Sequence, residues 1–203
     1  VTGSQTHGAV PWKGVDPIAI SSQIITALQT IVAREVNITQ VPAVVTIGSI
    51  HGGVRNNIIP EEVVMEGTIR TFNDEVRKDI HDSIRKKAEM IASASGATAK
   101  VEIFSDIAKV TFNEPSLTDK MVPSLERVYG KENVKITPFI TGAEDFPFFT
   151  DHAPGLYFFN GVAPDPSKAA PNHSPYFFAD ERNLKYGTKA LTQLAVDYLY
   201  LYK

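Results

Sequence analysis

The side chains with the clearest potential for chemistry are histidines. The chain has five histidines and no cysteine, so any bound metal ion must be held by imidazole nitrogens and carboxylates. His173 lies in the segment NHSPYFFADE, and a neutral imidazole in a Pro-rich loop with carboxylates close behind is a plausible zinc ligand. A single histidine makes no metal site, and a loop histidine bonded to backbone is an equally good interpretation of these residues.

Two further residues are candidates for stabilising a negatively charged oxygen. His7 is surrounded by small residues in the segment GSQTHGAVP, which exposes the ring in a turn where it can donate to a developing oxyanion. Asn57 lies in a comparable turn, NNIIP, and can add a second donor. Arg70 lies on an apolar stretch, where a guanidinium either pairs with a carboxylate of the protein or clamps a substrate carboxylate.

The composition argues against nucleic-acid binding, binding to anionic membranes and a membrane-spanning protein. The formal net charge of −3 gives no general attraction to nucleic acid or to anionic membranes, and no segment has the ~20 apolar residues of a membrane span. The absence of cysteine fits a reducing compartment, so we expect a cytoplasmic location. His51, His81 and His152 are interpreted as turn or surface residues.

The first half of the chain alternates between strand and helix patterns. Apolar residues repeat at helical spacing over 15–35 and 74–95, and β-branched residues predict strands over 43–50, 62–72 and 99–104. With residues 1–5 as the end of an opening strand, the order is β-α-β-β-α-β. This order predicts a ferredoxin-like two-layer sandwich of the α+β class over residues 1–112.

Residues 113–203 predict a second, incomplete unit. The segment 107–116 is expected to form a crossing strand and hinge, and helices are expected over 117–129 and 183–202. Strands are predicted only over 134–137 and 156–160. An α/β domain of this length normally has more strands, so this half is expected to be part of a larger α/β domain.

Four segments resemble a known family in order and spacing. They are THGAVPWKGVDP, GSIHGGVRNNIIPEEVVMEGTIRTF, TGAEDF and NHSPYFFADE. Together they resemble the aminoacylase and carboxypeptidase family of two-zinc amidohydrolases, metallopeptidase family twenty, with hippurate hydrolase and indole-acetyl-amino-acid hydrolase as the most similar branch. In that family a ferredoxin-like lid is inserted into an α/β catalytic domain.

The resemblance implies a role for each matching residue. His173 would be a zinc ligand of the catalytic domain, and His7 and Asn57 would reach the active site of a dimer partner to stabilise the tetrahedral intermediate. Arg70 would hold the carboxylate of an N-acyl amino acid or peptide substrate. Gly142 and Ala143 would line the substrate pocket.

The departures from the family pattern limit what the chain is expected to do alone. The resemblance places most zinc ligands and the Glu general base before the lid, and those motifs are missing here. We therefore expect an inactive chain that needs a missing N-terminal half, and a homodimer formed through the lid. A non-catalytic dimerisation module is the alternative. An RNA-binding module with the same element order is excluded, because residues 63–72 lack the aromatic stacking pair and the basic flank of such a module.

Overall fold

The computed structural model describes residues 1–104 and 109–201. The chain divides into two compact units, Val1–Val110 and Thr111–Lys203. Each unit is described by itself below, as unit 1 and unit 2.

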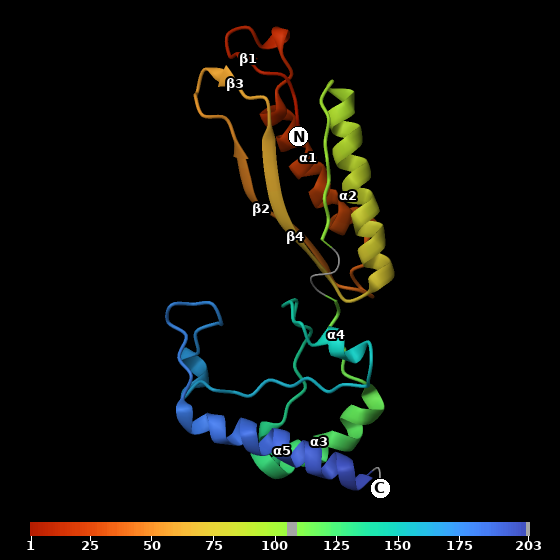
Figure 1. The fold of residues 1–203 in the computed structure, drawn as a ribbon, viewed down its shortest axis with the longest axis vertical. Helices are drawn as coiled ribbons and strands as arrows, with labels where there is room; N and C mark the ends of the chain where they lie inside the picture. Colours follow the sequence, from red (N-terminus) through yellow and green to blue (C-terminus); the bar gives the residue numbers. More distant parts are fainter. Residues whose placement is uncertain (105–108, 202–203) are drawn as a thin grey trace. The chain divides into compact units, whose positions relative to one another are not determined.

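Unit 1 is a layer of helices against a layer of strands (Figure 1). Helix α1 spans Pro17–Thr30 and continues as a π-helical turn, Ile31–Glu35, while α2 spans Asp74–Ala94. Both helices place apolar side chains against one face of the long strands β2 and β4. The buried core comprises Ile20, Ile24, Leu28, Ile31, Val45, Ile80, Ile84, Ala88, Ala92 and Ala97.

The strands of unit 1 form two antiparallel pairs. Strand β2, Ala43–Gly52, pairs with β4, Val63–Thr71, with an irregularity between Ile47 and Ser49. The short strands β1, Thr6–His7, and β3, Ile58–Ile59, pair with each other. The mixed α and β class is confirmed, whereas the complete ferredoxin-like arrangement stays a prediction.

The outer strands of the predicted sheet are shorter than expected. Thr2 forms isolated bridges to Glu62 and to Thr98, so the chain's first residues lie between the start of β4 and the segment after α2. The strand predicted over 99–104 is wrong, because no described residue continues the ladder beyond Thr98. The predicted crossing strand falls partly outside the described residues, and 109–114 form no strand.

Unit 2 is built on two helices (Figure 1). Helix α3, Pro115–Tyr129, packs against α5, Leu184–Leu201, and the short α4 spans Pro147–Thr150. Leu125, Val128 and Ala190 form the buried centre of this contact. Short 3-10 turns also occur, at Pro11–Lys13 of unit 1 and at Lys131–Asn133, Pro166–Lys168 and Glu181–Asn183 of unit 2.

The two strands predicted for unit 2 are not present. Residues 134–137 and 156–160 have no strand partner among the described residues, and a strand exists only through hydrogen bonds to a neighbour. Leu156 and Phe158 instead pack onto the helix pair. None of the described helices is long and apolar enough to cross a membrane.

Candidate functional site

The structure brings His7 and Asn57 together at the β1–β3 end of unit 1. His7 pairs with Ile58 across the two short strands, and the next backbone amide, Gly8 N, donates to Asn57 O at 2.8 Å. A Cβ atom on Gly8 would lie only 3.2 Å from that carbonyl oxygen, so the close approach favours glycine. Residues fifty positions apart in the sequence are therefore neighbours.

The ring of His7 is held by a local hydrogen bond. The backbone N–H of Ala9 donates to His7 Nδ1 at 3.0 Å, and the side chain is exposed. Because a neutral imidazole has one donor and one acceptor nitrogen, an accepting Nδ1 leaves the proton on Nε2. His7 thus presents an N–H donor to a ligand that approaches from solvent.

Asn57 belongs to a turn built by glycine and backbone hydrogen bonds. Ile58 N donates to Arg55 O at 3.3 Å, and Gly53 has a φ of +79°, which a residue with a side chain rarely adopts. Asn57 is exposed, as His7 is. Both side chains are accessible to a ligand from outside unit 1.

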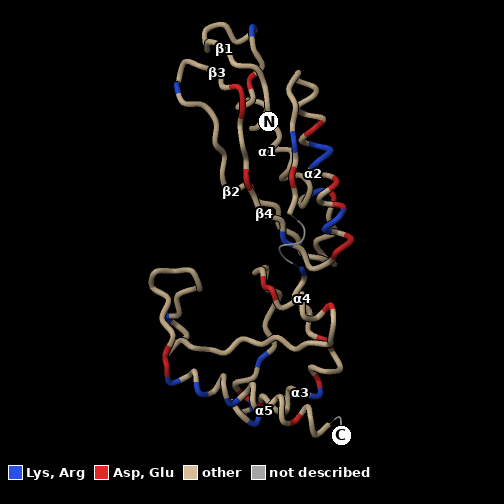
Figure 2. The backbone as a smooth tube through the Cα atoms, in the orientation of Figure 1, with Lys and Arg blue, Asp and Glu red and all other residues tan. Residues whose placement is uncertain are grey.

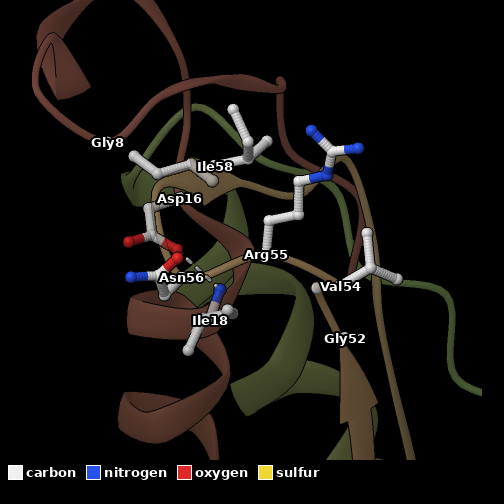
Figure 3. Close-up of a pocket in the computed structure, with 10 residues that line it drawn as sticks. Gly8, Asp16, Ile18, Gly52, Val54, Arg55, Asn56 and Ile58 are labelled. Atoms are coloured by element: carbon white, nitrogen blue, oxygen red, sulfur yellow. Dashed lines mark hydrogen bonds between the residues drawn. The ribbon is translucent and has the colours of Figure 1, made fainter.

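A hollow of about 480 Å³ lies beside this pair (Figure 3). One cation, Arg55, and one carboxylate, Asp16, line it. The lining residues are Gly8, Asp16, Ile18, Gly52, Gly53, Val54, Arg55, Asn56, Ile58 and Ile59.

Arg70 lies far from this end of the unit. It pairs with Val44 in the β2–β4 ladder, and the alternation along the strand places it on the face opposite the helices, since Ile69 packs against the core. Arg70 is seven residues along β4 from Val63, which corresponds to about 23 Å of strand. The structure therefore does not bring Arg70 together with His7 and Asn57.

The candidates of unit 2 lie in exposed loops. His173 is exposed in a turn with a φ of +66°, the one non-glycine residue with positive φ in the described chain. Such a backbone is uncommon for a residue with a side chain and is a reason to examine function. Gly142 and Ala143 are exposed in a segment without regular structure.

The loop after Ala143 is attached to the chain near Tyr157. The rings of Phe146 and Tyr157 have centroids 5.2 Å apart, and the backbone of Tyr157 exchanges two hydrogen bonds with the Asn113 side chain. Burial raises the pKa of the Tyr157 phenol, and the charge and hydrogen bond of Glu144 raise it further. Tyr157 therefore stays a neutral donor beside Glu144.

The family model of the peptidase dimerisation domain matches residues 1–95. Over 199 residues the chain is 38% identical to thermostable carboxypeptidase 2 of Saccharolobus solfataricus, covering 98% of this chain and 50% of that protein. It is 37% identical over 184 residues to N-acetyl-L-cysteine deacetylase of Bacillus subtilis, covering 89% and 42%.

Solved structures of hydrolases are also similar to this chain. A structure from methicillin-resistant Staphylococcus aureus superposes with a TM-score of 0.81 at 28% identity, covering 98% of this chain and 51% of that one. A dinuclear metal-binding peptidase of the M20 family from Bacillus subtilis gives 0.68 at 27%, covering 98% and 49%. The chain carries a peptidase dimerisation domain over residues 1–95 and is similar over nearly its whole length to a peptidase of the M20 family. It spans about half the length of the curated relatives it matches.

The described residues contain no candidate metal centre. Within 1–104 and 109–201, no three His, Cys, Asp or Glu side chains gather as a group that could hold a metal ion. His173 therefore belongs to no such group within the described residues. Dinuclear metal binding is a property of the Bacillus subtilis peptidase.

Two charged residues that line the hollow, Asp16 and Arg55, are not among the candidates of the sequence analysis. Asp16 caps the N-terminus of α1: its Oδ1 accepts from Ile18 N at 2.8 Å and from Ala19 N at 3.3 Å. Arg55 was not singled out at all. Its position two residues before Asn57 in the same turn was the available signal.

Proposed function

We propose that this chain supplies the dimerisation domain and part of the catalytic domain of a metal-dependent amidohydrolase. The reaction is hydrolysis of the amide bond of N-acyl amino acids or small peptides. The observation that carries this proposal is the neighbouring position of His7 and Asn57 at an exposed end of unit 1, next to a hollow. Relatives named as a carboxypeptidase and a deacetylase support an amide bond as the target.

His7 and Asn57 are proposed as donors to the oxyanion of the tetrahedral intermediate. The Ala9 hydrogen bond leaves Nε2–H of His7 free to donate, and the Asn57 amide adds N–H donors from the adjacent position. Donors fixed before reaction stabilise developing charge without reorganisation, and removal of one such donor typically costs about 10²–10³ in kcat.

Arg70 is proposed to hold the substrate's carboxylate in a different copy of the site. The separation along β4 is larger than an N-acyl amino acid, so one substrate cannot contact both Arg70 and the His7–Asn57 pair of the same unit 1. In a homodimer, His7 and Asn57 of one protomer serve the site of its partner. Arg70 of that same protomer serves a different site.

A homodimer formed through unit 1 is therefore part of the proposal, because Arg70 and the His7–Asn57 pair of one protomer serve different sites. The match of residues 1–95 to a peptidase dimerisation domain supports it. Within the described residues β2 pairs only with β4, so its other edge is open to strand addition. Val44, Ile50 and Val64 leave apolar surface exposed on these two strands.

The metal ions, zinc by family resemblance, are proposed to be held mainly by residues outside this chain. His173 contributes one ligand, and Gly142 and Ala143 line the pocket for the substrate. Unit 2 exposes many large apolar side chains, which suits a surface covered by more of a catalytic domain. Examples are Ile136 at 101%, Tyr176 at 84%, Leu199 at 66% and Phe178 at 65% exposure.

A non-catalytic dimerisation module is the second candidate. The absence of a metal-binding group among the described residues favours it, because such a module needs no metal. The cytoplasmic location expected from the lack of cysteine is likewise a proposal.

A complementation assay tests the proposed function. The part of the Saccharolobus solfataricus carboxypeptidase that the match does not cover is produced with this chain, in one reaction or as one fusion. Hippurate and acetyl-amino-acid hydrolysis are then followed with added zinc. We expect activity only from the combination, with His173→Ala abolishing it and His152→Ala, at another exposed loop histidine, leaving it intact.

Two outcomes would reject the proposal. Full activity of the combination carrying His173→Ala removes the assigned ligand. A combination that forms dimers but never hydrolyses either substrate supports the non-catalytic module.

A further inference from the structure

Arg55 is a cation without an assigned role in the proposed reaction. Its side chain is exposed, lines the hollow, and forms no hydrogen bond or ion pair with any described residue. A guanidinium presents five N–H donors and binds carboxylates in a bidentate manner. An unpaired guanidinium beside a hollow is therefore available to an anionic group of a ligand.

The other polar side of the hollow accepts hydrogen bonds. Figure 3 shows Asp16 and Asn56 together on one side, with the Arg55 side chain directed away from them. Oδ1 of Asp16 caps α1 through Ile18 N and Ala19 N, and its second oxygen, Oδ2, has no hydrogen bond to any described residue. Asp16 can thus accept an N–H while it repels a second negative charge.

Part of the lining of the hollow is apolar, and the backbone at Gly52 is constrained. Side chains of Ile18, Ile58 and Ile59 line it. A Cβ on Gly52 would lie 2.6 Å from a methyl group of Val63, so the backbone at this rim is packed closely against β4. A volume of about 480 Å³ falls within the range of about 300–1,000 Å³ that is usual for small-molecule sites.

We propose that this hollow is the subsite for the substrate's acyl group and selects a short acyl chain that ends in a carboxylate. The carboxylate pairs with Arg55, the methylene groups lie on the isoleucines, and the N–H of the scissile amide donates to Asp16 Oδ2. This inference rests on the proposed function, and names the substrate class of the same site.

The neighbourhood of the hollow supports this assignment. Gly8, which lines it, directly follows His7, and Asn56 and Ile58, which also line it, flank Asn57. A group bound in the hollow therefore lies next to both oxyanion donors. Arg70 of the partner protomer remains for the carboxylate of the amino-acid portion, on the other side of the scissile bond.

Direct binding to this chain tests the subsite without turnover or metal. The probe is glutaramate, whose amide stands for the scissile bond and whose carboxylate stands for the acyl terminus. Glutarate carries a second carboxylate in place of the amide, and butyramide lacks the carboxylate. Binding is followed by the backbone amide NMR shifts of Gly8, Gly52 and Gly53.

We expect glutaramate to bind at least about fivefold more tightly than either comparison compound. Arg55→Gln should remove the difference between glutaramate and butyramide, and Arg34→Gln, at an exposed arginine of the same unit, should preserve it. Asp16→Asn keeps a capping side chain and should remove the preference for glutaramate over glutarate.

Equal binding of butyramide and glutaramate by the unaltered chain would overturn the inference. So would an Arg34→Gln variant that loses as much affinity as Arg55→Gln, since binding would then follow net charge. Failure of the hydrolysis assay with intact glutaramate binding would reject the amidohydrolase function and leave a carboxylate site.

Discussion

The imidazole of His7 is oriented by a backbone amide rather than by another side chain. Ala9 N lies two residues away in the same turn, so the hydrogen bond that fixes the tautomer forms with the turn itself. The orientation therefore depends on Gly8, whose amide joins the turn to Asn57. One short backbone segment sets the position of both proposed oxyanion donors.

His81 makes the free energy of unfolding of unit 1 depend on pH. Burial on α2 lowers the pKa of this half-buried histidine, and the nearby charges of Arg85 and Arg77 lower it further. The folded state thus disfavours the protonated ring, so its contribution to stability is lost as pH falls below the ordinary histidine value of about 6.5.

We expect His81→Gln to make the free energy of unfolding less dependent on pH between about 5 and 7. The effect should stay below about 1 kcal/mol, because the ring is partly solvated. Urea unfolding at pH 5, 6 and 7 measures it, with His51→Gln as the exposed control. Equal pH slopes in the parent and the His81 variant would contradict the assignment.

Residue chemistry alone singled out some of the residues that lie at the β1–β3 end of unit 1 and not others. His7 and Asn57 were recognisable because each lies in a turn of small or turn-forming residues, which exposes a polar side chain. Arg55 lies in the same turn as Asn57, but whether an arginine has a partner depends on contacts across the fold. The distance between Arg70 and Asn57 likewise required the register of β4 against β2.

At the scale of elements, α2 depends on the cap at its N-terminus. The Oδ1 atom of Asn73 accepts from Val76 N at 2.9 Å, and Asp74 and Glu75 in the first turn complement the helix dipole. We expect Asn73→Ala to lower the free energy of unfolding by about 1 kcal/mol and Asn73→Ser to recover most of it. Urea titrations of both variants provide the measurement, and equal losses in both would show that capping is not the cause.

The predicted helices depend mainly on local sequence, whereas the predicted strands depend on a neighbouring segment. Helical periodicity placed α1, α2, α3 and α5 correctly within a few residues, because a helix satisfies its backbone groups within one segment. The segments 134–137 and 156–160 have strand-like composition but no partner among the described residues. Composition indicates that a segment prefers the strand conformation. Whether a strand forms depends on a neighbouring strand, which only the fold can provide.

The whole molecule is expected to act as a pair of chains. We expect light scattering at micromolar concentration to give about twice the 22.2 kDa mass of one chain. Val44→Lys, on the exposed face of β2, should shift the protein toward monomer, whereas Ile38→Lys, at an exposed turn outside the strands, should not. A monomeric mass for the unaltered chain at high micromolar concentration would reject the dimer proposed through unit 1.

Metal binding by the chain alone should be weak, whatever its oligomeric state. Catalytic zinc needs about three protein ligands, and the described residues offer His173 without a second and third ligand beside it. One imidazole cannot hold the ion tightly, so calorimetric titration with zinc should show no stoichiometric binding, and His173→Ala should change little. Addition of the uncovered half of the Saccharolobus solfataricus relative should create tight binding that His173→Ala weakens by about 10–100-fold or more, as loss of a ligand or its support does. Tight, stoichiometric zinc binding by the chain alone would show instead that it assembles its own centre. The five histidines would then be replaced one at a time to find the ligands, because the ion would have to be held by a grouping that the described arrangement does not contain.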